Sequence, residues 1–141
     1  MIQKPRYFQL EELVPRSLFL AHKHELDKLW LIFDARVLWT LQSLRMRYGK
    51  LVMNTWLWGG KSQERGFRVW TTSTGAPLSQ HKCGRAADVV PIETTAEEIR
   101  QDILTHSERD EFRYIRCIEE GTAWLHFDTR NWIGPVWVVK E

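Results

Sequence analysis

The chain has 141 residues, of which 43% are hydrophobic and 27% are charged, and its formal net charge is +2 at pH 7. This length suits one domain over residues 1–141 whose core needs no disulfide support, and the composition excludes a disordered or membrane-embedded chain. Two cysteines do not make a disulfide scaffold. No dense stripe of Lys and Arg with interleaved aromatic residues indicates nucleic-acid binding. We expect a monomer.

The N-terminal segment 1–6 lacks the long apolar stretch of a secretory signal. The most apolar window, residues 29–41, is interrupted by Asp34 and Arg36, which excludes a membrane span. We therefore expect no membrane insertion and a protein that stays in the cytoplasm as synthesised. It would act on the cell wall only after release or export, and a compact chain without a signal is typical of a phage-encoded protein.

The first third of the chain is predicted to be helical. Residues 11–14 indicate a short helix that is interrupted at Pro15. Between His24 and Tyr48, apolar residues recur at intervals of three and four, which predicts one long amphipathic helix. Gly49 follows where a left-handed C-terminal cap is expected.

The pattern changes after this helix. Residues 51–56 are predicted to form a strand, and an irregular segment over 61–78 has a length that is often functional within a compact domain. A second short strand is expected over 85–90. The sequence at 95–98 fits a capping box, which predicts a helix that ends near His106.

The C-terminal part is predicted to be extended. Runs over 112–118 and 123–129 indicate an antiparallel hairpin, and 136–139 could add one more strand. The expected fold is a single α+β domain in which a small, mainly antiparallel sheet is packed with helices around a cleft.

Two of the five histidines, His81 and His126, stand in segments that suggest metal binding. A bend after His81 can bring it toward Asp88, seven positions later on the following strand, and His126 lies on a strand of the predicted hairpin. Two imidazoles and one carboxylate are the typical ligand set of a catalytic zinc site, with a fourth position left for water. The other histidines are expected to be exposed or to cap helices: His22, His24 and His106.

The spacing of these residues resembles the signature of the zinc D-Ala-D-Ala carboxypeptidase family. The resemblance is carried by Ser79, His81, Gly84, Ala86, Asp88, Trp124 and His126 and covers roughly residues 26–127. That family includes phage endolysins that cut the L-Ala–D-Glu bond, and its fold is shared with the Hedgehog signalling domain. The resemblance implies that His81, Asp88 and His126 bind Zn²⁺ in a Hedgehog/DD-peptidase-like fold. Cys83 could itself bind zinc, but we expect it to be a small buried residue because three ligands are already supplied.

The resemblance also implies an arginine that holds a substrate carboxylate, in the loop before the first ligand. This loop offers Arg65 and Arg68, whose planar guanidinium groups suit a carboxylate. The alternative is that both arginines are solvated and pair with Glu64. Ser79 and Trp124 are expected to contact the substrate too, with Trp124 as an aromatic wall of its groove.

The general base is not fixed by the sequence. Family members commonly carry Asp or Glu three residues before the second histidine, where this chain has Ala123. Glu120 is the preferred candidate, because an even offset from His126 places it on the metal-facing side of a regular strand. Glu119 would then point away, unless a bend at Gly121 reverses the two. The alternative is that both glutamates solvate a hairpin turn.

These features together predict a zinc-dependent peptidase that hydrolyses an amide bond in the peptide stem of bacterial peptidoglycan. It would be either a carboxypeptidase or an endolysin-type endopeptidase. Zinc would lower the pKa of a bound water to about 7, and a glutamate would accept the proton of that water. The alternative, which Ala123 keeps open, is a non-catalytic, zinc-stabilised binding module of the same fold.

Overall fold

The computed structural model describes residues 1–140, and within them the strands form one five-stranded mixed sheet in the order β1-β2-β4-β3-β5. The strands are β1 (Leu51–Val52), β2 (Ala86–Pro91), β3 (Cys117–Glu120), β4 (Leu125–Asp128) and β5 (Trp137–Lys140). Three neighbouring pairs are antiparallel, whereas β3 and β5 are parallel. The α+β class and the antiparallel hairpin are therefore confirmed, and the C-terminal strand gives the sheet its mixed character.

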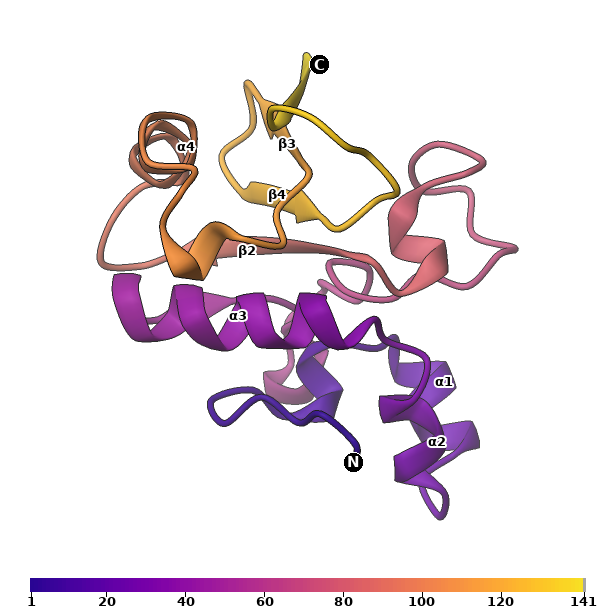
Figure 1. Cartoon of the computed structure of the whole chain (residues 1–141). Helices are drawn as coiled ribbons and strands as arrows, with labels where there is room; N and C mark the ends of the chain where they lie inside the picture. Colours follow the sequence, from indigo (N-terminus) through magenta and orange to yellow (C-terminus); the bar gives the residue numbers. More distant parts are fainter. Residues whose placement is uncertain (141) are drawn as a thin grey trace.

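Helices pack along this sheet and extend beyond it (Figure 1). The α-helices are α1 (Arg16–Ala21), α2 (Leu26–Trp30), α3 (Ala35–Tyr48) and α4 (Ala96–Thr105). Short 3₁₀ turns are η1 (Leu10–Glu12), η2 (Trp56–Trp58), η3 (Gln80–Cys83) and η4 (Asp110–Phe112). In Figure 1, α3 lies along β2, and α4 contacts β3 and β4. The backbone N–H of Glu98 donates to Thr95 Oγ1 at 3.1 Å, which confirms the predicted cap of α4.

The single long helix expected between residues 24 and 48 is wrong, because the chain breaks between α2 and α3. Asp34 caps α3 by accepting the backbone N–H of Arg36 at 2.9 Å, in an extended conformation that cannot continue α2. The Asp34 N–H donates instead to the carbonyl oxygen of Gly84 at 2.8 Å. This hydrogen bond joins the segment between α2 and α3 to the turn that follows η3.

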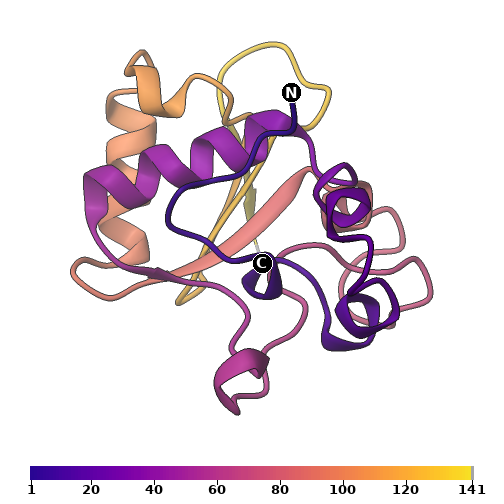
Figure 2. The ribbon, with the colours of Figure 1, turned by 90° about the horizontal axis from the view of Figure 1, so that it is seen from below.

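Two other predicted elements differ in extent. The strand expected over 51–56 is limited to β1, and the hairpin strand expected over 112–118 is β3, which begins only at Cys117. Gly49 ends α3 where expected, with a positive φ of 82°, but its ψ of −153° is not that of a left-handed helical cap. The segment 61–78 is irregular, as predicted. Figure 2 shows the N-terminal segment running beside α3, where the Arg6 N–H donates to the Gln42 side chain at 2.8 Å.

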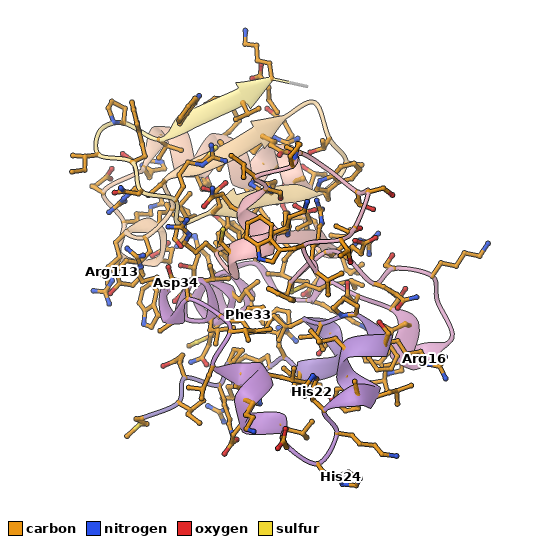
Figure 3. The ribbon with its side chains drawn as sticks, turned by 90° about the vertical axis from the view of Figure 1, so that its right-hand side faces the viewer. Arg16, His22, His24, Phe33, Asp34 and Arg113 are labelled. Atoms are coloured by element: carbon orange, nitrogen blue, oxygen red, sulfur yellow. The ribbon has the colours of Figure 1, made fainter. Side chains whose placement is uncertain are left out.

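One core fills the space between the helices and the sheet. Its fully or almost fully buried members include Leu38, Leu41, Val89, Ile99, Ile118 and Phe127. Within residues 1–140, no helix combines the length and the apolar character that crossing a membrane requires. In Figure 3, His24 lies at the tip of the connection between α1 and α2, and it is exposed as expected.

Candidate metal centre

Three buried side chains from three elements converge: His81 of η3, Asp88 of β2 and His126 of β4. Their ligand atoms all lie within 4.8 Å of one another. Oδ1 of Asp88 is 3.3 Å from Nε2 of His81 and 2.9 Å from Nδ1 of His126. Asp88 and His126 are directly opposite in the β2–β4 ladder, which places both side chains on one face of the sheet. This group could hold a metal ion.

A short turn carries His81 to the group. The Ser79 hydroxyl caps η3 by accepting the His81 N–H at 3.3 Å, and η3 ends at Gly84, whose φ is 67°. A Cβ on Gly84 would lie only 2.1 Å from the carbonyl oxygen of Ile32, so the close approach of the two chain segments requires glycine. Ser79, expected to contact substrate, lines the cavity beside the group and also serves as this cap.

A backbone carbonyl orients the His81 ring. Nδ1 of His81 is 2.8 Å from the carbonyl oxygen of Gly66, which can only accept, so Nδ1 carries the proton. Nε2 is therefore the nitrogen that faces Asp88, 3.3 Å from its Oδ1. Histidine ligands of metals commonly donate their second N–H to a carbonyl or carboxylate in this manner, and His81 fits that pattern.

A buried carboxylate orients the His126 ring. Nε2 of His126 lies 2.8 Å from Oδ2 of Asp128. The fully buried Asp128 carboxylate also accepts two hydrogen bonds from the Arg130 guanidinium, Nε to Oδ1 at 2.8 Å and Nη2 to Oδ2 at 2.6 Å. Burial alone would lower the pKa of His126, but its hydrogen bonds to Asp128 and Asp88 outweigh burial and raise that pKa to about 9. Nδ1 is the nitrogen that faces the group, and a metal would replace its proton.

Asp88 is ionised and shared between the histidines and an arginine. Burial alone would raise its pKa, but hydrogen bonds from His126 and His81 hold the pKa well below its usual range. Its second oxygen, Oδ2, accepts Nη2 of Arg68 at 3.1 Å. Arg68 also donates Nε to the Glu64 carbonyl oxygen at 2.7 Å, and its side chain is only 11% exposed. Arg68 is therefore neither solvated nor paired with the Glu64 carboxylate.

The structure places Glu119 beside the group, and the expected position of Glu120 is wrong. Oε1 of Glu119 is 3.8 Å from Nδ1 of His126, whereas Glu120 lies 3.8 Å from Lys140 Nζ and lines a different cavity. Glu120 was expected to face the metal because it lies an even number of residues before His126, which holds only within one straight strand. The chain instead turns between β3, which carries Glu120, and β4, which carries His126. Across that turn Ile118 pairs with Phe127, so the next position of β3 comes opposite His126.

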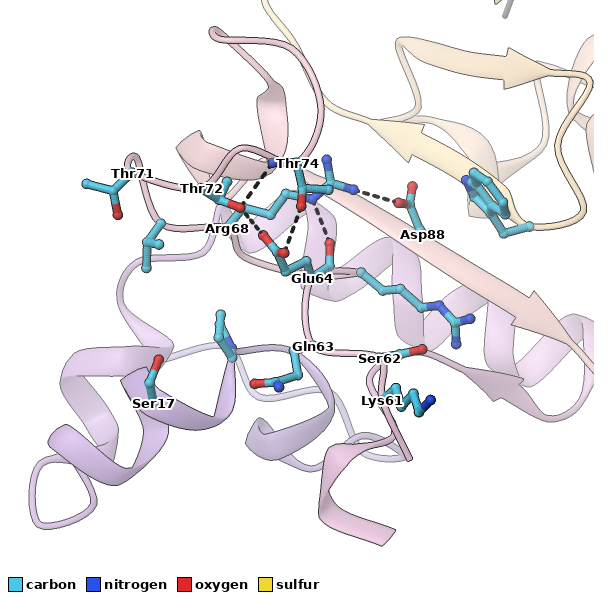
Figure 4. Close-up of a pocket in the computed structure, with 14 residues that line it drawn as sticks. Ser17, Lys61, Ser62, Gln63, Glu64, Arg68, Thr71, Thr72, Thr74 and Asp88 are labelled. Carbon is cyan, nitrogen blue, oxygen red and sulfur yellow. Dashed lines mark hydrogen bonds and ion pairs between the residues drawn. The ribbon is translucent and has the colours of Figure 1, made fainter. Parts of the chain in front are cut away.

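Two adjoining cavities give access to the group. The metal cleft has a volume of about 490 Å³ and is lined by His81, Asp88, Glu119 and His126 among others. The lateral groove, of about 550 Å³, is lined by residues of the 61–74 segment and appears in Figure 4. Arg68, Thr74, Asp88 and Trp124 line both cavities, so the groove leads to the metal group. Trp124 lies where the two cavities meet, whereas Arg65 lines the lateral groove and not the metal cleft.

Some site features were missed by the sequence analysis. The partnership of Asp128 with Arg130 was one, although the alternation of His126, Asp128 and Arg130 along the chain was a usable signal. Cys83 is half-buried at the end of η3, rather than buried, and does not belong to the three-residue group.

No family model, curated protein or solved structure matches this chain.

Proposed function

We propose that this chain is a zinc-dependent peptidase that hydrolyses an amide bond in the peptide stem of bacterial peptidoglycan. The observation that carries the proposal is the buried group of His81, Asp88 and His126, opening into a cleft that also holds the Glu119 carboxylate. Two imidazole nitrogens and one carboxylate oxygen suit zinc and leave a coordination position free. The resemblance to the carboxypeptidase signature supports the choice of peptidoglycan.

The protein's own residues would prepare and complete the reaction. Bound zinc supplies an acidified water and polarises a substrate carbonyl. Hydrogen bonds to Gly66 and Asp128 fix the rings of His81 and His126 in the orientation that binding requires. Glu119 accepts a proton from the attacking water and returns it to the leaving amine nitrogen.

Glu119 can also supply the carboxylate that is missing at position 123, where this chain has Ala123. A carboxylate is absent from the position where the family commonly has one, three residues before His126. In this fold the neighbouring strand β3 provides a carboxylate in the cleft, 3.8 Å from Nδ1 of His126. The catalytic proposal therefore does not depend on position 123.

The test combines metal analysis with digestion of purified peptidoglycan. We expect one zinc per chain after dialysis, together with new amino termini released from the wall. Glu119→Gln should retain zinc and lose about 10²–10⁴-fold in turnover, the usual scale for a general base. Glu120→Gln is the matched control and should keep its turnover, because Glu120 faces another cavity.

Two results would contradict the proposal in different ways. Stoichiometric zinc without new amino termini would identify a non-catalytic, zinc-stabilised binding module. Full activity of Glu119→Gln would show that the base lies elsewhere and would remove the assigned proton transfer.

A further inference from the structure

Helix α4 carries a buried arginine whose charge the metal centre does not use. Arg100 is only 4% exposed, although arginine is almost never buried to this degree unless it is paired. Among residues 1–140, its one carboxylate partner is Glu97, which accepts Nε at 2.9 Å and whose side chain is 59% exposed. Burial of a charge is unfavourable unless hydrogen bonds compensate for the lost water. The remaining donors of Arg100 therefore indicate what this buried charge holds together.

The Nη donors of Arg100 reach one short turn, the connection between β3 and β4. Nη2 donates to the Thr122 carbonyl oxygen at 3.0 Å, and Nη1 donates to the Trp124 carbonyl oxygen at the same distance. The Thr122 hydroxyl also donates to that Trp124 carbonyl oxygen, at 2.7 Å. The guanidinium thus fastens two positions of the turn to α4 at once, which its planar fork of donors allows.

This turn controls a part of the site that the sheet itself holds only weakly. β3 and β4 are paired at two positions, of which Ile118–Phe127 is the one nearer the turn. Glu119 and Trp124 lie beyond it, and both line the metal cleft. Glu119 is paired only with the outermost strand, β5. His126 is held differently, because β4 pairs with β2 at four positions that include His126. The placement of Glu119 beside His126 therefore depends on the turn, whereas the ligand itself is fixed by β2.

We infer that Arg100 is a positioning residue that fastens the β3–β4 turn and thereby sets Glu119 and Trp124 in the metal cleft. Arg100 lines neither this cleft nor the lateral groove, so it acts through the turn and not on a substrate. It lines a separate cavity of about 370 Å³, together with Glu120. The part of Glu119 in turnover rests on the proposed function, whereas the order of the turn does not.

NMR relaxation of the zinc-free protein tests the turn without an assay of activity. In the wild type, the backbone amides of residues 121–124 should have order parameters of about 0.85, the value of a rigid backbone. Arg100→Met keeps an apolar side chain but removes every donor, and should lower these order parameters below about 0.6, the range of flexible segments. The amides of β2 should stay rigid in both proteins, because Arg100 makes no hydrogen bond to that strand.

Zinc affinity and turnover separate positioning from general support of the fold. Arg100→Met should bind zinc as tightly as wild type in competition with a chelator, because β2 holds β4 in place. Its turnover of peptidoglycan should fall by about 10- to 100-fold, the scale of a catalytic group displaced by about 1 Å. Thr122→Val removes the turn hydroxyl with little change of shape and should act in the same direction. Because it removes no charge, Thr122→Val carries the test if Arg100→Met fails to fold.

Two further variants serve as controls. Glu97→Gln removes the exposed ion-pair partner of Arg100 but leaves the donors to the turn, and should change neither the order of the turn nor turnover. Arg100→Lys keeps the charge on a single ammonium without the planar fork. This variant should therefore restore turnover only in part, relative to Arg100→Met.

The outcomes distinguish this inference from the proposed function. Full turnover or a rigid turn in Arg100→Met overturns the inference and leaves the peptidase proposal intact. Zinc affinity that falls in step with turnover also overturns it, because Arg100 would then support the whole domain. If the wild type releases no amino termini from peptidoglycan, but the turn loosens in Arg100→Met while zinc is retained, the inference stands and the peptidase proposal fails.

Discussion

Replacing Gly84 by alanine tests whether the turn after η3 fixes the metal group. Gly84 has φ 67° and ψ 23°, a left-handed conformation that costs alanine about 1–2 kcal/mol. The added Cβ would also lie 2.1 Å from the carbonyl oxygen of Ile32 and 3.2 Å from Cα of Phe33. Relief of such a contact by backbone movement typically costs about 1–3 kcal/mol more. Gly84→Ala should therefore destabilise the fold by about 2–5 kcal/mol.

Gly59→Ala is the matched control for this prediction. Gly59 has a similar φ of 85°, but among the described residues nothing lies within 4 Å of an added Cβ. The control carries only the conformational cost, about 1–2 kcal/mol. The difference between the two variants therefore measures the clash with the segment between α2 and α3.

Urea unfolding without zinc measures both free energies, and equilibrium dialysis measures zinc retention. Gly84→Ala should unfold more easily than Gly59→Ala and also retain zinc less tightly, because the displaced turn carries His81. Equal destabilisation and equal zinc affinity in the two variants would refute the reasoning. Such results would mean that the chain relaxes around the added Cβ beside Ile32 at no energetic cost, and that this contact does not position His81.

Three further outcomes are expected from single residues. His126→Ala should abolish zinc retention in dialysis, and unaltered zinc content would show that the ligand assignment is wrong. Burial and the hydrogen bond to Asp102 raise the pKa of Tyr48 to about 12, so the stability this bond adds, about 1 kcal/mol, is complete below pH 10. It should be lost toward pH 12, where Tyr48→Phe and wild type unfold at the same urea concentration. Burial raises the pKa of the Cys117 thiol to about 12, so at pH 8 a thiol reagent should label half-buried Cys83 and spare Cys117.

Local spacing indicated His81 and Asp88, whereas the grouping of His126 with them came from the motif resemblance, because His126 and Asp88 are 38 positions apart in the chain. His81 and Asp88 flank a turn and a strand, and His126 lies on a hairpin strand whose apolar and polar residues alternate. Such patterns depend on neighbours along the chain, which a single sequence displays. The capping of α4 and the end of α3 at Gly49 were predictable for the same reason.

The features that differed from prediction depend on distant contacts. Apolar residues continue in helical spacing across the α2–α3 break, where Asp34 caps α3 and its N–H donates to the distant Gly84 carbonyl oxygen. The face occupied by Glu119 is set by the pairing of β3 with β4, which no residue near Gly121 specifies alone. The engagement of Arg68 follows from its hydrogen bond to Asp88, which lies twenty positions later in the chain.

The support of the first ligand extends into the N-terminal part of the chain. The Gly66 carbonyl that orients His81 belongs to a segment packed so closely on Leu13 that an added Cβ would lie 2.2 Å from the Leu13 carbonyl oxygen. The next residue, Phe67, donates its N–H to that same oxygen at 2.8 Å.

On the other side, Gly84 makes an equally close approach to Ile32. The carbonyl that orients the His81 ring and the turn that carries His81 are thus each held by a contact with residues that precede α3. Because a ligand that binds only the folded state stabilises that state, metal binding and the packing of these two segments must be coupled. If the proposed metal binds here, a substitution that loosens either contact should weaken its binding while leaving all three candidate ligands unchanged.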